Sequence, residues 1–162
     1  MLTQTQASEM WEYLQNIPVA MMATQDEGKI RARPMHNVQK EFSGKLWFFT
    51  DVTAAKTEEI ATSQQVCLSY EDTHKQLYIS VSGTANTIRD PTLINELWNP
   101  MVAAWFAEGK NDPRIALVEV DVHQAEVWDA KRNRVNQLFK MAIANIRHER
   151  PDLGEHRQYP SH

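Results

Sequence analysis

Residues 45–56 read KLWFFTDVTAAK, and this stretch carries the strongest local signal in the chain. Its apolar part, residues 46–49, predicts a strand that runs into a polar turn at 50–53. A helix is predicted over residues 54–62, with Lys56 in its first turn. A helix N-terminus carries partial positive charge, so a lysine there costs roughly 0.3–1 kcal/mol unless an anion binds the free N–H groups. This stretch alone leaves two interpretations open: an anion site, or an exposed lysine whose flexible side chain points away from the helix axis, which is common for a lysine in a first turn.

Residues 30–36 read IRARPMH and give a second reason to expect an anion. Arg31, Arg33 and Met35 alternate, so in an extended strand they share one face. Pro34 cannot donate a ladder hydrogen bond, which favours an edge strand, a bulge or a place where the strand faces something other than a strand. Two arginines beside a strand–turn–helix site could hold a phosphate bidentately, which a lone lysine cannot. The alternative is a solvated strand face near a turn.

The composition of the whole chain narrows the function classes. At 162 residues it is long enough for one domain with a proper core, and we expect this domain over residues 1–150 and a polar tail over 151–162. The net charge of −4, with scattered Lys and Arg, argues against a nucleic-acid binder. Cys67 is the only cysteine, so no intrachain disulfide or thiol metal site is expected. We recognise no signal peptide and no apolar run long enough to span a bilayer, and we therefore expect a cytoplasmic protein without membrane contact.

The order of predicted elements favours a mainly β fold with flanking helices. Strands are expected over 19–24, around 31–33, and over 46–49, 65–70, 77–88, 115–122 and 125–128; helices are expected over 4–16, 54–62, 101–106 and 133–148, and from 91 onward. Asp90 is suited to cap the helix that starts at Pro91, and Gly83 suggests a bulge or bend. Short consecutive strands joined by tight turns are typical of an antiparallel barrel rather than a doubly wound parallel sheet. The five glycines form no glycine-rich run, which argues against Rossmann and P-loop folds.

Other site chemistry finds little support in the sequence. The six histidines never fall at ligand spacing, so we expect no metal site. No Gly-x-Ser-x-Gly elbow is present, which argues against a serine hydrolase. Trp98, Trp105 and Trp128 could each stack on a planar ligand, but packing in the core is favoured for each of them.

Several short motifs together resemble one known family. They are Arg33-Pro34-Met35, Phe49-Thr50-Asp51 with Lys56, Val81-Ser82-Gly83-Thr84-Ala85, Leu97-Trp98-Asn99-Pro100, Trp105-Phe106 with Gly109 and Asp112-Pro113, and Ala125-Glu126-Val127-Trp128-Asp129. With them the chain resembles the pyridoxamine-phosphate-oxidase-like flavoproteins, a superfamily of FMN-binding split β-barrels. It is most similar to their general-stress-protein branch, over residues 8–140. Each motif is weak alone, but their order and spacing are fairly specific.

The resemblance implies a cofactor and an assembly. Arg33, Thr50 and Lys56 match family positions that hold the FMN phosphate, which would give the anion site a named ligand. Because the FMN sites of this family are built at the interface of a homodimer, the resemblance also implies a dimer of this chain.

It further implies how the flavin ring is surrounded. The backbone of Pro34, Met35 and His36 would lie along the isoalloxazine ring, and Phe49 would pack near it. Trp128 matches a family tryptophan that approaches the flavin from the partner subunit.

Two departures from the family pattern bear on the substrate. The oxidases carry an Arg-Leu-His-Asp-Arg pattern where this chain has residues 134–138, so one arginine remains while the histidine and the second arginine are missing. A family lysine near the flavin is replaced by Val38. A substrate phosphate would then be poorly held, which argues against vitamin B6 oxidation.

The leading prediction is therefore a flavin-dependent oxidoreductase in which FMN takes electrons from a reduced nicotinamide and passes them to a small acceptor. No side chain is assigned as a general acid or base, and catalytic residues stay unassigned. A stress protein that sequesters flavin without turnover is the alternative from another class. A barrel without a cofactor, or one with a related flavin such as a deazaflavin, also stays open.

Overall fold

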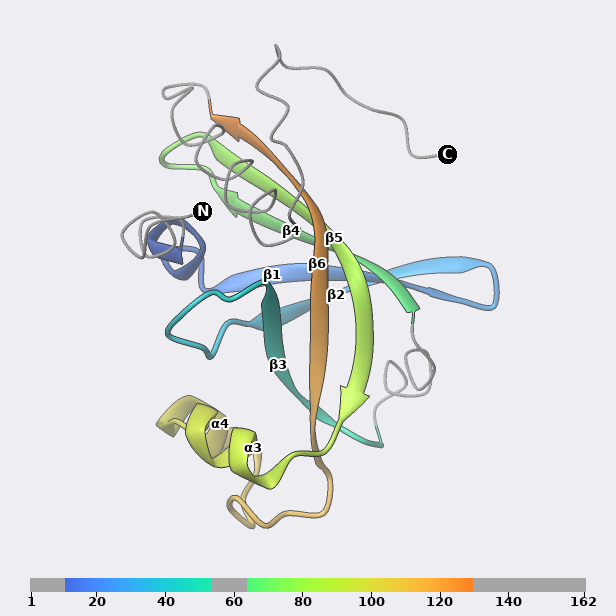
Figure 1. Ribbon diagram of the computed structural model, residues 1–162, viewed down its shortest axis with the longest axis vertical. Coiled ribbons are helices and arrows are strands. Elements are labelled where there is room, and N and C mark those ends of the chain that lie inside the picture. The colour runs from blue at the N-terminus through green and yellow to red at the C-terminus, as the bar shows by residue number, and fades with distance from the viewer. Residues whose placement is uncertain (1–10, 54–63, 130–162) are drawn as a thin grey trace.

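The chain forms a curled antiparallel sheet with two short helices at one end (Figure 1). This computed structural model describes residues 11–53 and 64–129. Within these ranges the strands are β1 (Val19–Asp26), β2 (Lys29–His36), β3 (Lys45–Asp51), β4 (Gln64–Asp72), β5 (Leu77–Ile88) and β6 (Ile115–Asp129). The helices are α3 (Pro91–Leu97) and α4 (Pro100–Trp105), and residues 11–15 are also helical. The predicted helices over 54–62 and 133–148, the start of the first helix and the predicted tail lie outside the described residues.

The six strands follow the order β2-β1-β4-β5-β6-β3, and every neighbouring pair is antiparallel. Strands β2 and β3 are the two edges, and the curl of the sheet brings them into contact. The edge position of β2 agrees with the presence of Pro34, which is opposite Met21 on β1. The mainly antiparallel β fold with short helices that the sequence predicted is confirmed.

The core fills the inside of the curled sheet, as the alternation of each strand requires. In β3 every second residue is buried, and Leu46 and Phe48 are almost fully so. A second, smaller apolar cluster lies where α3 and α4 meet the ends of β3 and β6; it is built on Ile94, Val102, Phe106, Ile115 and Leu117. This second cluster fixes the helices that border the candidate site.

Strand β6 is one long strand where the sequence predicted two. Ser82 is opposite Gln124 and Gly83 is opposite Val122, so His123 is the extra residue of a bulge at the predicted position of Gly83. Gly83 is needed here because a Cβ on it would lie 2.8 Å from Cγ1 of Val120. The two predicted strands, 115–122 and 125–128, are thus one strand, because the bulge absorbs the extra residue and the ladder continues.

Both helices have a capped start with proline in the first turn, which the sequence predicted for the one that begins at Pro91. The Asp90 carboxylate accepts a hydrogen bond of 3.1 Å from the backbone N–H of Leu93. Asn99 caps α4 in the same way, and α4 therefore begins at Pro100 rather than Met101. In the described part of the chain, no helix has the length and apolar character needed to cross a membrane.

Candidate functional site

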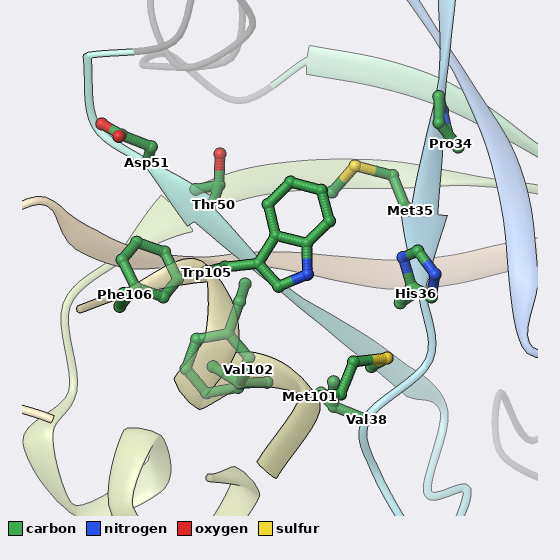
Figure 2. A pocket seen from close by; sticks show the side chains of 11 residues that line it. Pro34, Met35, His36, Val38, Thr50, Asp51, Met101, Val102, Trp105 and Phe106 are labelled. Carbon is green, nitrogen blue, oxygen red and sulfur yellow. The ribbon is translucent and has the colours of Figure 1, made fainter. Parts of the chain in front are cut away.

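A cavity of about 370 Å³ opens between the two edge strands of the sheet and helix α4. Figure 2 shows its lining, which consists of Pro34, Met35, His36, Val38, Phe49, Thr50, Asp51, Met101, Val102, Trp105 and Phe106. Most of these side chains are apolar, and only a few polar groups are set among them. A volume of this size and such a lining are typical of a small-molecule site.

Strand β2 supplies one wall through Pro34, Met35 and His36. Arg31, Arg33 and Met35 alternate along β2 as predicted, and Met35 is buried where this face meets the core. Asn37 directly follows the strand, and its side-chain amide donates hydrogen bonds of 3.1 Å to the carbonyl oxygens of Leu14 and Ile17.

The Asn37 side-chain oxygen accepts a hydrogen bond of 3.1 Å from the hydroxyl of Tyr70. Burial raises the pKa of Tyr70, so this hydroxyl keeps its proton and its donor role. The wall that β2 gives to the cavity is therefore fixed by partly buried hydrogen bonds at its end.

Strand β3 supplies the opposite wall, and its central feature is the hydroxyl of Thr50. Thr50 is 2% exposed, and its Oγ1 has no hydrogen-bond partner among the described residues. An unsatisfied buried hydroxyl costs about 1–3 kcal/mol, so such a group on a cavity wall indicates a ligand that completes it. Of the buried polar side-chain atoms without a partner in residues 11–53 and 64–129, this is the one whose residue lines the cavity.

Asp51 follows Thr50 and turns its carboxylate toward the end of the strand. Its Oδ1 accepts hydrogen bonds from the hydroxyl of Thr53 at 2.6 Å and from the Thr53 backbone N–H at 2.8 Å. These bonds lower the pKa of Asp51, so the carboxylate is ionised at neutral pH. Asp51 is thus an acceptor in the turn rather than a carrier of a mobile proton.

Helix α4 supplies the third wall, which rests on an aromatic cluster. The rings of Phe49 and Trp98 meet edge to face with centroids 6.0 Å apart, and Phe106 lies 6.5 Å from each of them. Trp98 is therefore a packing residue, as the sequence favoured. For Trp105 the prediction of core packing was wrong. Val102 and Phe106 occupy the buried face of the helix, and Trp105 is therefore 73% exposed.

Five of the eight predicted site residues line this cavity: Pro34, Met35, His36, Phe49 and Thr50. Arg33 precedes them on β2 and is half-buried, but it is not part of the lining. Lys56 lies outside the described residues. Trp128 lies opposite Tyr78 near the end of β6, which Figure 1 shows to be far from α4.

The sequence did not assign the residues that α4 adds to the site, among them Met101 and Trp105. Their spacing of four residues, which places two side chains on one face of a helix, was the available signal. Val38 also lines the cavity, so an apolar side chain occupies the place where the family pattern has a lysine. In the ranges that the structure describes, no three side chains of the His, Cys, Asp or Glu type gather as metal ligands would.

A comparison with known families gives a match over residues 5–152 to the family described as pyridoxamine 5'-phosphate oxidase like. The chain belongs to this family. Its split barrel agrees with that of a general stress FMN/FAD binding protein from Xanthomonas citri, with a TM-score of 0.70 and 29% identity, over 81% of this chain and 93% of that one. The chain is thus a family member whose fold is that of the general stress proteins.

Two further relatives extend this picture. A general stress protein 26 from Jannaschia sp. CCS1 matches with a TM-score of 0.66 and 26% identity, over 91% of this chain and 92% of that one. The protein bli-3 of Neurospora crassa is 25% identical over 146 residues, which cover 83% of this chain and 70% of that protein. The match in each case takes in most of both chains, so the family relationship is not confined to one motif.

Proposed function

We propose that the cavity between β2, β3 and α4 binds FMN and that the protein is a flavin-dependent oxidoreductase. Electrons would pass from a reduced nicotinamide to the flavin and from it to a small acceptor. Membership of the pyridoxamine 5'-phosphate oxidase like family and the flavin-binding relative from Xanthomonas citri support the cofactor.

The observation that carries the proposal is the Oγ1 of Thr50, which is buried and has no hydrogen-bond partner within residues 11–53 and 64–129. A hydroxyl can donate a hydrogen bond to a phosphate oxygen, and this bond would remove the cost of burying it alone. Arg33 on β2 and Lys56 beyond β3 would add the positive charge that a phosphate requires. The residues present therefore fit a phosphate at one end of a mostly apolar cavity.

The remaining lining fits the ring. Met35 and Phe49 would exclude water from the inner side of the ring, and the backbone of residues 34–36 would lie along its edge. When bound, the flavin supplies the hydride and electron chemistry. The chain's contribution is then to bind and orient the ring and to keep water from it.

We further propose that two copies of the chain form the complete site. Trp128 lies at the end of β6 away from the cavity of its own chain, so a role beside the flavin needs a second copy. The homodimer that the family resemblance implies would supply it.

A flavin carrier without turnover is the second candidate function. Among the described residues that line the cavity, the titratable ones are His36 and Asp51, and Asp51 is held ionised by Thr53. A lining with so little acid–base chemistry suits a protein that only holds its flavin.

An absorption spectrum after loading with FMN and exhaustive dialysis tests both candidates. Retained flavin at one per subunit, bleached by NADH or NADPH under anaerobic conditions, supports the oxidoreductase. Retained flavin that neither nicotinamide bleaches supports the carrier. If dialysis removes all the flavin, the proposed cofactor is wrong. Light scattering on the same sample gives the mass, and a monomer with bound flavin would contradict the shared site.

A further inference from the structure

Trp105 is the most exposed tryptophan of the chain, although it lines the cavity. All five tryptophans lie in the described ranges, and Trp105 is 73% exposed while the other four are buried or half-buried. A large apolar ring is seldom left in water on this scale without a partner. Because Trp105 lines the cavity, its exposed ring can contact a ligand that binds there.

The direction of the indole is set by the helix beneath it rather than by a loose loop. Val102 and Phe106 are 3% and 6% exposed and hold α4 against the second apolar cluster. The Asn99 side chain fixes the first turn through a hydrogen bond of 3.0 Å from the Val102 N–H. With this face buried, Trp105 must project from the other face. Met101, four residues earlier, projects with it and is 39% exposed.

The indole projects over the cavity. In Figure 2 it lies amid the lining residues, with Met35 and His36 on the side of β2 and Thr50 on the side of β3. The exposed indole is thus available to a ligand in the cavity. A flat aromatic ring is the ligand shape that gains most from such a surface, because ring stacking adds to the burial of apolar area.

We propose that Trp105 determines specificity for the ring: its indole stacks on the outer side of a planar aromatic group bound in the cavity. The inference rests on the proposed flavin site and assigns different parts of the ligand to different residues. Trp105 acts on the ring alone, whereas Thr50 acts on the phosphate alone. The ligand class that Trp105 selects is therefore a planar, fused aromatic ring, with or without a phosphate.

Binding of FMN, riboflavin and lumichrome to the wild type, Trp105→Leu and Trp105→Phe tests whether Trp105 acts on the ring alone. Lumichrome has the fused ring without a ribityl chain or phosphate. We expect Trp105→Leu to weaken all three ligands by the same factor, about 10-fold, and Trp105→Phe to weaken them less. Trp47→Leu and Trp47→Phe are the matched controls, because Trp47 lies on β3 outside the cavity and bonds Glu119. They should leave all three affinities unchanged.

The emission of the bound flavin is an independent readout. A stacked indole donates an electron to an excited flavin and quenches it, so bound riboflavin should be dark in the wild type and brighter in Trp105→Leu. Urea unfolding of each variant checks that it is folded. If the wild type binds all three ligands and Trp105→Leu binds them equally well with unchanged emission, the role of Trp105 is wrong and the flavin site stands. If the wild type binds none of them, the flavin site is wrong and the role of Trp105 falls with it.

Discussion

Arg114 holds the buried carboxylate of Asp112 with two contacts, Nη2–Oδ2 at 2.7 Å and Nε–Oδ1 at 3.1 Å. The same carboxylate accepts a hydrogen bond of 2.9 Å from the Arg114 backbone N–H. The carbonyl oxygen of Arg114 in turn accepts from the N–H of Val52 at 2.8 Å, just after the β3 wall of the cavity. This pair thus links the start of β6 to the end of β3.

The Asp112 pair predicts a dependence of stability on acid pH. The bonds from Arg114 lower the pKa of Asp112 below the 3.8 of an unperturbed side chain. A group with a lowered folded pKa adds stability above its unfolded pKa, and this is lost as the pH falls through the folded value. We expect Asp112→Asn to be less stable than the wild type above about pH 5, with the gap closing below about pH 4. Urea midpoints of both proteins between pH 2.5 and 7 measure this difference in stability. A difference that does not change with pH would contradict an ionised Asp112 bound by Arg114.

Gly83 predicts a steric effect on the bulge of β6. A Cβ at this position would meet Cγ1 of Val120 at 2.8 Å and would press closer still on the carbonyl oxygen of Asp121. We expect Gly83→Ala to lower the free energy of unfolding by about 1–3 kcal/mol, as overpacking of a close contact does. Ser82→Ala, one residue away, is the control and should change stability by less than about 0.5 kcal/mol. An unchanged urea midpoint for Gly83→Ala would mean that β6 can move away from β5.

The strands could be predicted from the sequence because their signals are local. Alternation fixes the faces of Leu46 and Phe48, and the missing N–H of Pro34 makes an edge one of the few positions open to its strand. The two strand walls of the cavity followed from residues 30–36 and 45–53 together with the family resemblance.

The α4 wall could not be predicted in the same way. Trp105 and Thr50 are far apart in the sequence, and only the curl of the sheet and the small aromatic cluster bring them to one cavity. A helix of six residues has too few side chains for a periodic pattern to tell which face the core covers. The continuity of β6 could not be predicted for a related reason, since the bulge at His123 depends on the close approach of Gly83 on another strand.

The Thr50 hydroxyl predicts a loss of FMN affinity without a loss of stability. Thr50→Val keeps the shape of the side chain and removes a buried hydroxyl that has no partner in the described structure. The free protein should be as stable as the wild type or slightly more stable. FMN should bind about 10-fold more weakly, since a hydrogen bond to a charged group contributes about 1.5 kcal/mol or more, while lumichrome should bind equally well.

Thr87→Val is the matched control for this change. The Thr87 hydroxyl is also buried without a partner among the described residues, but Thr87 does not line the cavity. This variant should keep the wild-type affinity for FMN. Calorimetric titrations of both variants decide the matter: an equal affinity of Thr50→Val for FMN would remove Thr50 from the phosphate site.

Arg33 and Lys56, the two cations that are predicted to bind the phosphate, give the sharpest test of where it lies. We expect Arg33→Met and Lys56→Met each to weaken FMN by about 1.5–3 kcal/mol, because each would remove a charge-assisted contact. This is roughly 10- to 150-fold in Kd for each change. Riboflavin, which has no phosphate, should bind to the double variant as it does to the wild type, so that the preference for FMN disappears. Arg31→Met is the control: Arg31 shares the strand face of Arg33, but its side chain is 57% exposed and it pairs with Asp26 at 3.9 Å. Equal losses for FMN and riboflavin in the double variant would show that the two cations support the fold of the site rather than the phosphate.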